Sequence, residues 1–165
     1  MQVASSALDY LLIETIPLAQ QVSLSLYGDN GDNEANYRIE KYGFKVGHGL
    51  AQIVTQNRPR MEQQLDIIKF VCKELWAILY KKQMDNLKTN HRDTYVLIDN
   101  KFEYCLRMST NSDREVTAEM AKPYLWFPAG VIRGFLHAMG LKSTVHFEIT
   151  EVPQVTFQVL VDTSA

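Results

Sequence analysis

Two cysteines, Cys72 and Cys105, are the first candidates for nucleophilic chemistry in this chain. Cys72 falls on an apolar helical stripe, and we expect a core residue there because free cysteines are so often buried. Cys105 falls between Tyr104 and Leu106, on the outer face of a predicted strand where a thiol can meet solvent. A reactive thiol also needs an electropositive neighbour that lowers its pKa, and the sequence shows none. Catalysis by Cys105 with His146 would require facing strands that bring the two within hydrogen-bond reach.

The histidines offer no metal-ligand spacing such as His-x-x-x-His, and no Cys-x-x-Cys accompanies them. They are His48, His91, His137 and His146. We therefore expect no metal and no cofactor. The chain also lacks a phosphate-binding P-loop and a Gly-x-Ser-x-Gly nucleophile turn. One alternative stays open: a sensor domain that encloses a small apolar ligand or haem, with His137 or His48 as the iron ligand.

Arg133 is a single charge in an otherwise apolar segment, flanked by Val131, Ile132, Phe135 and Leu136. It has two interpretations. In one, its guanidinium binds a carboxylate on an adjacent subunit or loop. In the other, its stem lies along a core helix and the charged end reaches water.

Length and charge restrict the class of protein. A chain of 165 residues with 46% hydrophobic content can bury a full core, and it fits one domain over residues 1–165. A net charge of −2 gives no reason to expect nucleic-acid binding. The cysteines are too few for a disulfide framework, which favours a cytosolic chain. No run approaches the ~18 apolar residues of a membrane span, and no secretory signal is evident, so we expect membrane contact to be peripheral.

Apolar residues that recur at steps of three and four predict four helices. The helices span about residues 6–26, 34–56, 61–82 and 123–139. Pro17 predicts a kink in the first, because proline removes a backbone donor and crowds the preceding turn. Residues 28–33 and 108–122 are predicted surface loops, because small polar residues and glycine dominate them.

Alternating apolar and polar residues predict four strands, at about 94–98, 102–106, 145–149 and 155–161. The first two form a hairpin with a short turn at 99–101, and the last two join through 152–154. The apolar face of the sheet should lie against the helices. The predicted fold class is α+β, with about four α-helices packed on one face of a four-stranded antiparallel sheet.

The two helices at 6–26 and 34–56 are apolar around more of their circumference than one core-facing stripe requires. In the second of them, Ile39, Tyr42 and Val46 follow one stripe while Phe44 and Ala51 follow another. Surplus apolar surface of this kind indicates a protein interface. A helix buried centrally in its own domain would show the same pattern, and the sequence does not separate the two.

Three blocks carry a family resemblance: residues 42–47, residues 65–102, and residues 130–136 with the following 140–141. They resemble the small core subunits of the transport protein particle, TRAPP, and most of all its subunit 6 branch. The resemblance covers roughly residues 34–161. It implies a non-catalytic structural subunit of a tethering and Rab guanine-nucleotide-exchange assembly, which acts in ER-to-Golgi and intra-Golgi vesicle transport. It also implies a cytoplasmic protein peripherally associated with Golgi and ER–Golgi intermediate membranes.

The resemblance further implies a heterodimer with the central, acylatable TRAPP subunit of the subunit 3 branch, formed through the first two helices. Other TRAPP subunits would be further partners, a Rab-type GTPase would be contacted indirectly, and a homodimer could form in the absence of the partner. Carried over residue by residue, the partner interface comprises Leu8, Leu11, Leu12, Ile16, Ala19, Tyr42, Gly43, Val46, Gly47 and Leu50. For the two glycines, close packing against the domain's own third helix is an equal alternative.

The acylatable paralogue carries a cysteine several residues before its third helix. The corresponding segment here, residues 56–61, reads Gln-Asn-Arg-Pro-Arg-Met and contains no cysteine. The resemblance therefore does not extend acylation to this chain.

Overall fold

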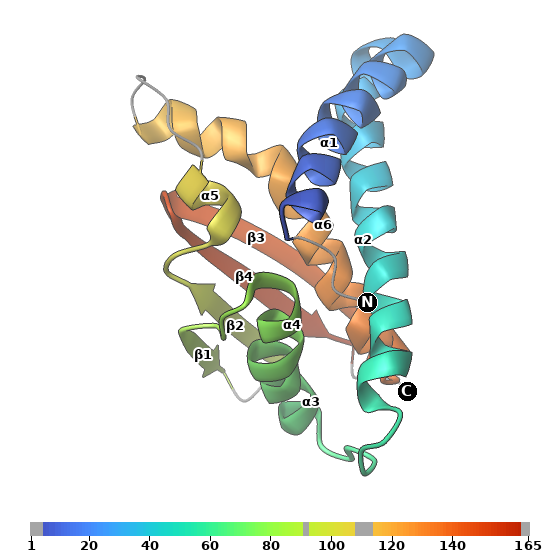
Figure 1. The fold of residues 1–165 in the computed structure, drawn as a ribbon, viewed down its shortest axis with the longest axis vertical. Coiled ribbons are helices and arrows are strands. Elements are labelled where there is room, and N and C mark those ends of the chain that lie inside the picture. The colour runs from blue at the N-terminus through green and yellow to red at the C-terminus, as the bar shows by residue number, and fades with distance from the viewer. Residues whose placement is uncertain (1–4, 91–92, 108–113, 163–165) are drawn as a thin grey trace.

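A computed structural model describes residues 5–90, 93–107 and 114–162 (Figure 1). The helical elements are α1 (Ser5–Tyr27), the 3-10 turn η1 (Gly28–Asn30), α2 (Gly31–Thr55), α3 (Gln64–Phe70), the π-helical η2 (Val71–Leu75), α4 (Trp76–Tyr80), α5 (Glu103–Arg107) and α6 (Arg114–Ala138). The strands are β1 (Asn86–Thr89), β2 (Thr94–Asp99), β3 (Ser143–Glu151) and β4 (Gln154–Val161). The predicted α+β class is confirmed.

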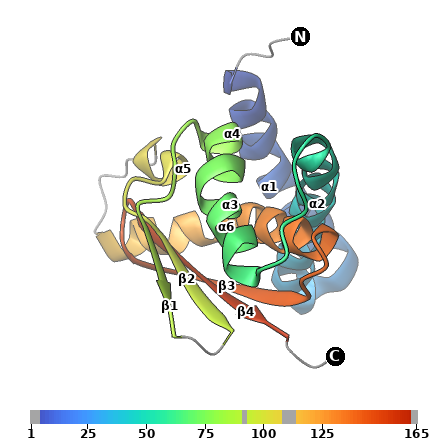
Figure 2. The same ribbon diagram turned by 90° about the horizontal axis from the view of Figure 1, so that it is seen from below.

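The sheet is antiparallel throughout, with the strand order β1-β2-β4-β3. The helices lie on one side of it, as the view from below shows (Figure 2). Along β4, Val155, Phe157, Val159 and Val161 are buried. Every second side chain of this strand therefore points into the core, as the alternating sequence predicts.

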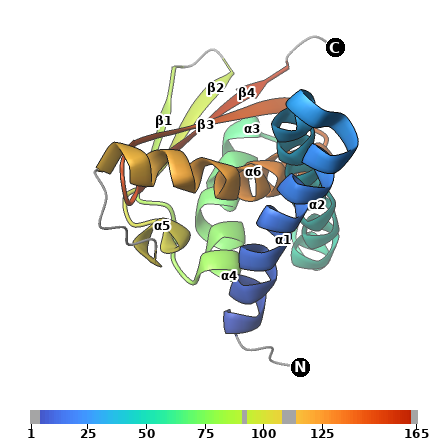
Figure 3. The ribbon, with the colours of Figure 1, turned by 90° about the horizontal axis from the view of Figure 1, so that it is seen from above.

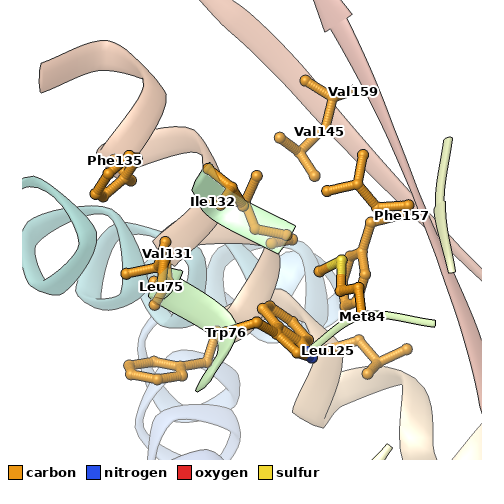
Figure 4. Close-up of a cluster of buried hydrophobic side chains, with 14 of the residues drawn as sticks. Leu75, Trp76, Met84, Leu125, Val131, Ile132, Phe135, Val145, Phe157 and Val159 are labelled. Carbon is orange, nitrogen blue, oxygen red and sulfur yellow. The ribbon is translucent and has the colours of Figure 1, made fainter. Parts of the chain in front are cut away.

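The core fills the space between the sheet and the helix layer (Figure 4). Trp76 is fully buried in it, with its ring 5.5 Å from that of Phe157 in an edge-to-face contact. Its indole Nε1 donates a 2.8 Å hydrogen bond to Asp99, whose carboxylate is fully buried and also binds Lys82. The sequence suggested a turn at 99–101, whereas Asp99 is the last residue of β2 and anchors it to α4.

The α3–η2–α4 segment is one continuous helical run from Gln64 to Tyr80, close to the predicted 61–82. It buries Ile68, Cys72 and Leu75 on one side. Cys72 is thus a core residue, as predicted.

Two predicted elements are wrong. Residues 102–106 are not a strand: β2 pairs with β1, and Glu103–Arg107 forms the short helix α5. Phe102, Tyr104 and Cys105 are all buried there. Periodicity does not separate a short buried helix from a strand, and β1 has too few apolar residues for an alternating pattern to predict it.

The predicted surface loop at 108–122 is also wrong over 114–122, where α6 begins at Arg114; residues 108–113 lie outside the described ranges. Thr117, Ala121 and Leu125 are buried at successive steps of four, so one face of this polar stretch packs inward. The loop predicted at 28–33 is longer than the observed connection, which is the turn η1 alone, because α2 already starts at Gly31.

Candidate partner interface

Helices α1 and α2 lie side by side on the flank of the molecule away from β1 and β2 (Figure 3). They carry most of the large apolar side chains that are exposed among the described residues. On α1 these are Tyr10, Leu11, Ile13, Leu18, Val22, Leu24, Leu26 and Tyr27, and on α2 they are Tyr37, Tyr42, Val46 and Ile53. Exposed apolar residues are ordinary when scattered, but their concentration on two adjacent helices marks a candidate interface.

An apolar hollow of about 250 Å³ opens between these helices. Its lining comes from four helices and consists of Leu11, Leu12, Thr15, Ile16, Ile39, Tyr42, Val46, Leu79 and Phe127. Leu11 is 61% exposed, Tyr42 46% and Val46 41%, so these three form the rim. Leu12, Ile16 and Ile39 are buried and form the floor. We call this feature the α1–α2 hollow.

The predicted interface residues thus divide by burial. Leu11, Tyr42 and Val46 face outward. Leu12, Ile16 and Ala19 are buried within the chain itself, and Leu50 is half-buried against the core. Helical spacing placed all of these on neighbouring stripes but did not tell which stripe the rest of the chain covers. The side chain of Leu8 lies outside what the structure describes.

Gly43 and Gly47 pack against α6 of the same chain. A Cβ atom on Gly47 would lie 2.0 Å from the carbonyl oxygen of Val131, and one on Gly43 would lie 2.1 Å from that of Phe127. Two glycines of α6, Gly130 and Gly134, meet carbonyl oxygens of α2 at 2.1 and 2.0 Å in the same way. The two backbones are therefore in direct contact. Both glycines therefore serve close packing within the chain, and the helix that they pack against is α6 rather than the predicted third helix.

Arg133 also joins α6 to α2. Its Nη2 donates a 2.8 Å hydrogen bond to Glu40, its Nε donates to the other carboxylate oxygen, and its guanidinium lies 4.7 Å from the ring centre of Phe44. The sequence left two interpretations. In one, Arg133 binds a carboxylate on an adjacent subunit or loop, and in the other its charged end reaches water without a carboxylate partner. The structure places the carboxylate on α2 of the same chain, where the bidentate pair fixes the two helices in register.

The thiols are poorly suited to chemistry. Burial raises the pKa of Cys72 to about 12 and that of Cys105 to about 11, and the charge of Asp99 adds to the second shift. Cys105 is 2% exposed on α5, whereas the sequence suggested an accessible strand position. A thiol held in its protonated form at neutral pH is a weak nucleophile.

The histidines form no metal site that the structure describes. The ring centres of His48 and His137 are 6.0 Å apart, next to Phe44, and His146 is exposed on β3. Among the described residues, no group of three or more His, Cys, Asp or Glu side chains is placed to hold a metal ion. Within the same residues, no helix is both long and apolar enough to span a membrane.

The family model for transport protein particle (TRAPP) components matches residues 8–162. This chain belongs to the TRAPP family. Trafficking protein particle complex subunit 6b of Danio rerio is 38% identical over 144 residues, covering 87% of this chain and 90% of that protein. Subunit 6B of Homo sapiens is 44% identical over 124 residues, covering 75% and 77%. These relatives place the chain in the subunit 6 branch of TRAPP.

A solved TRAPP structure has the same fold. The crystal structure of a trafficking protein particle complex subunit 3 from Naegleria fowleri, covalently bound to palmitic acid, superposes with a TM-score of 0.68 at 16% identity. The match covers 93% of each chain. At this identity the likeness concerns the arrangement of helices and strands.

Sequence reasoning missed part of the α1–α2 hollow. Leu79 of α4 and Phe127 of α6 complete its wall. Neither residue differs in type or spacing from its core-facing neighbours. Only the packing of α4 and α6 against α1 and α2 brings them there, so no signal in the sequence would have found them.

Proposed function

We propose that this chain is a non-catalytic structural subunit of TRAPP that heterodimerises with the central, acylatable subunit through α1 and α2. The observation that carries the proposal is the α1–α2 hollow, with its exposed rim of Leu11, Tyr42 and Val46. Covering such a rim removes apolar surface from water, which is the main driving force of stable protein association.

The size of the hollow favours a protein partner over a small ligand. At about 250 Å³ it falls below the roughly 300–1,000 Å³ of ligand pockets. It suits one or two apolar side chains of a partner, in the manner of a central anchor surrounded by contacts that exclude water. The surrounding apolar residues of α1 and α2 would supply those contacts.

Family membership and the buried thiols support the proposed role within the assembly. TRAPP is a tethering and Rab guanine-nucleotide-exchange assembly, and we infer that this subunit stabilises it rather than forming the exchange surface. Buried Cys72 and Cys105 support a non-catalytic role. The site of action would be the cytoplasmic side of Golgi and ER–Golgi intermediate membranes, with contact to lipid through the assembly.

The test is co-expression with a subunit 3 paralogue, with the complex measured by light scattering. Leu11→Asp combined with Val46→Asp places two carboxylates on the rim of the hollow while leaving its floor intact. Leu12 is unsuitable because it is 5% exposed, and a buried charge there would unfold the chain. The matched control is Leu106→Asp on α5, where a leucine is similarly exposed at 55%.

We expect a one-to-one complex with the wild type and the control, and its loss in the double variant with an unchanged circular dichroism spectrum. An intact complex in the double variant would show that heterodimerisation does not use the α1–α2 hollow. Nucleotide exchange by the isolated chain, or a coloured or lipid-loaded preparation, would instead bring forward a catalytic or ligand-sensing function.

A further inference from the structure

Strand β3 forms one edge of the sheet and is its longest strand, with nine residues against four for β1 at the opposite edge. In Figure 1 it runs along the upper side of the sheet, below α6. A long edge strand presents a row of backbone donors and acceptors to its surroundings.

The pairing of β3 with β4 fixes which of these groups face outward. The Asp162 N–H donates to the carbonyl of Lys142 at 2.9 Å, which makes Lys142 and Asp162 a hydrogen-bonded pair. In an antiparallel ladder hydrogen-bonded and non-hydrogen-bonded pairs alternate. Since Ser143 faces Val161 in the register, Ser143, Val145 and Phe147 direct their N–H and C=O groups away from β4. In the part of the chain that the structure describes, no hydrogen bond reaches this side.

This edge carries no proline and no charged lysine, arginine or carboxylate over its first five residues, 143–147. Its register with β4 is regular until an irregularity after Glu148. A hollow of about 440 Å³ borders its first four residues, between β3, α2 and α6. The first residues of β3 therefore border unfilled space where the outward groups begin.

We propose that β3 pairs antiparallel with β3 of a second copy of this chain, about a two-fold axis at Val145. The register follows from the outward groups: Val145 faces Val145, and Ser143 faces Phe147 of the other copy. Both pairs are hydrogen-bonded ones, so the same three residues of each copy satisfy one another. Such an interface is isologous, and the two sheets join into one.

The charges flanking the axis are self-complementary in this register. Lys142 of one copy faces Glu148 of the other, and the two-fold axis repeats the pair. Both side chains are exposed, and in the described structure neither forms an ion pair within its own chain. A second copy therefore meets opposite charge at both ends of the paired stretch, which is the observation that selects it as the occupant.

The inference does not depend on the proposed heterodimer. The hollow beside β3 and the α1–α2 hollow share no lining residue. Tests of the β3 pairing are therefore made in the Leu11→Asp, Val46→Asp background, in which association through α1 and α2 is suppressed.

Engineered cysteines test the register directly. Thr144 faces His146 of the other copy in a non-hydrogen-bonded pair, where Cα atoms lie about 4.5 Å apart, within disulfide range. Identical positions are diagonal neighbours at roughly 7–8 Å and do not bridge. We expect a disulfide-linked dimer when Thr144→Cys and His146→Cys proteins are mixed and oxidised, and little from either alone. The native thiols Cys72 and Cys105 are buried and do not compete.

The charge pair supplies a second test, by sedimentation equilibrium. Lys142→Glu or Glu148→Lys should weaken the dimer roughly tenfold, because each creates two like-charge contacts, and the double exchange should restore it. Ser143→Pro removes one outward N–H at the first position of the strand, where proline is tolerated, and should also weaken it. A folded chain that stays monomeric at all concentrations, or equal cross-linking in mixed and single samples, would overturn the proposal.

Discussion

Gly47 of α2 lies against the carbonyl group of Val131 on α6, so close that a methyl group on Gly47 would stand 2.0 Å from that oxygen. The obstacle is backbone rather than a movable side chain. The two longest described helices therefore meet without side chains between them, and their spacing is set by glycine.

Gly47→Ala should destabilise the protein by roughly 2–3 kcal/mol, because α2 and α6 must separate to admit the methyl group. The matched control is Gly49→Ala, two residues along the same helix, where nothing lies within 4 Å of the added carbon. The control should gain up to about 1 kcal/mol from helix propensity. Urea denaturation of both variants measures the difference, and equal effects would contradict the contact.

Loss of the Glu40–Arg133 pair should cost roughly 1–3 kcal/mol, less than a fully buried pair because the arginine side chain is 36% exposed. A double-mutant cycle with Glu40→Gln and Arg133→Met separates the coupling from the loss of either side chain. We expect a favourable coupling that persists in high salt. Simple additivity of the two changes would show that the pair does not hold α2 to α6.

The Asp85 carboxylate should add stability at neutral pH that disappears in acid. The Asn100 N–H donates to it at 2.7 Å and lowers its pKa, with Lys82 contributing. A pKa lower in the folded state gives stability that is present above the unfolded value of about 3.9 and is lost as pH falls through the folded value. The side chain is 39% exposed, so the effect should stay below about 1 kcal/mol.

Thermal denaturation of Asp85→Asn from pH 7 down to pH 2 measures this contribution. The gap to wild type should be widest near neutral pH and close in acid. Glu62→Gln, at an exposed carboxylate that accepts no hydrogen bond from any described residue, is the control and should show little gap at any pH. A gap that widens in acid would reverse the sign and contradict the assignment.

The native thiols should react at least about a hundredfold more slowly with a disulfide reagent at pH 8 than an exposed cysteine does, given the raised pKa values of Cys72 and Cys105. Thr144→Cys provides the exposed reference in the same chain. Both native thiols should become fully reactive in denaturant. Rapid labelling of Cys105 in the native protein would show that α5 opens readily.

Helices and strands whose apolar residues recur with a clear period were predictable, because the period indicates the type of element and the side that is buried. The alternating residues of β4 and the apolar stripe of the third helix are examples. The elements that failed have weak or short patterns. The polar start of α6 buries only small residues such as Thr117 and Ala121, and α5 spans five residues, too few for any period to develop.

The candidate interface was half predictable for a related reason. Helical spacing places Leu11 beside Leu12, and Tyr42 beside Gly43, but it does not say which member of each pair faces the rest of the chain. That depends on which distant segments pack against each helix, as α6 packs against Gly43 of α2. The glycines show this best, since spacing alone fits a partner's helix as well as the domain's own.

By itself, the sequence determined the α+β class, most helices and strands, membership of the TRAPP family and the burial of Cys72. Each of these rests on local periodicity or, for the family, on short blocks of characteristic residues. Tertiary structure alone decided which helical stripes remain exposed, that Gly43 and Gly47 pack against α6, that Arg133 binds Glu40, and that β3 is an edge strand of the sheet. These features depend on which segments that are distant in the sequence pack together. The energy of each contact belongs to both contacting residues, and no local pattern identifies the second residue.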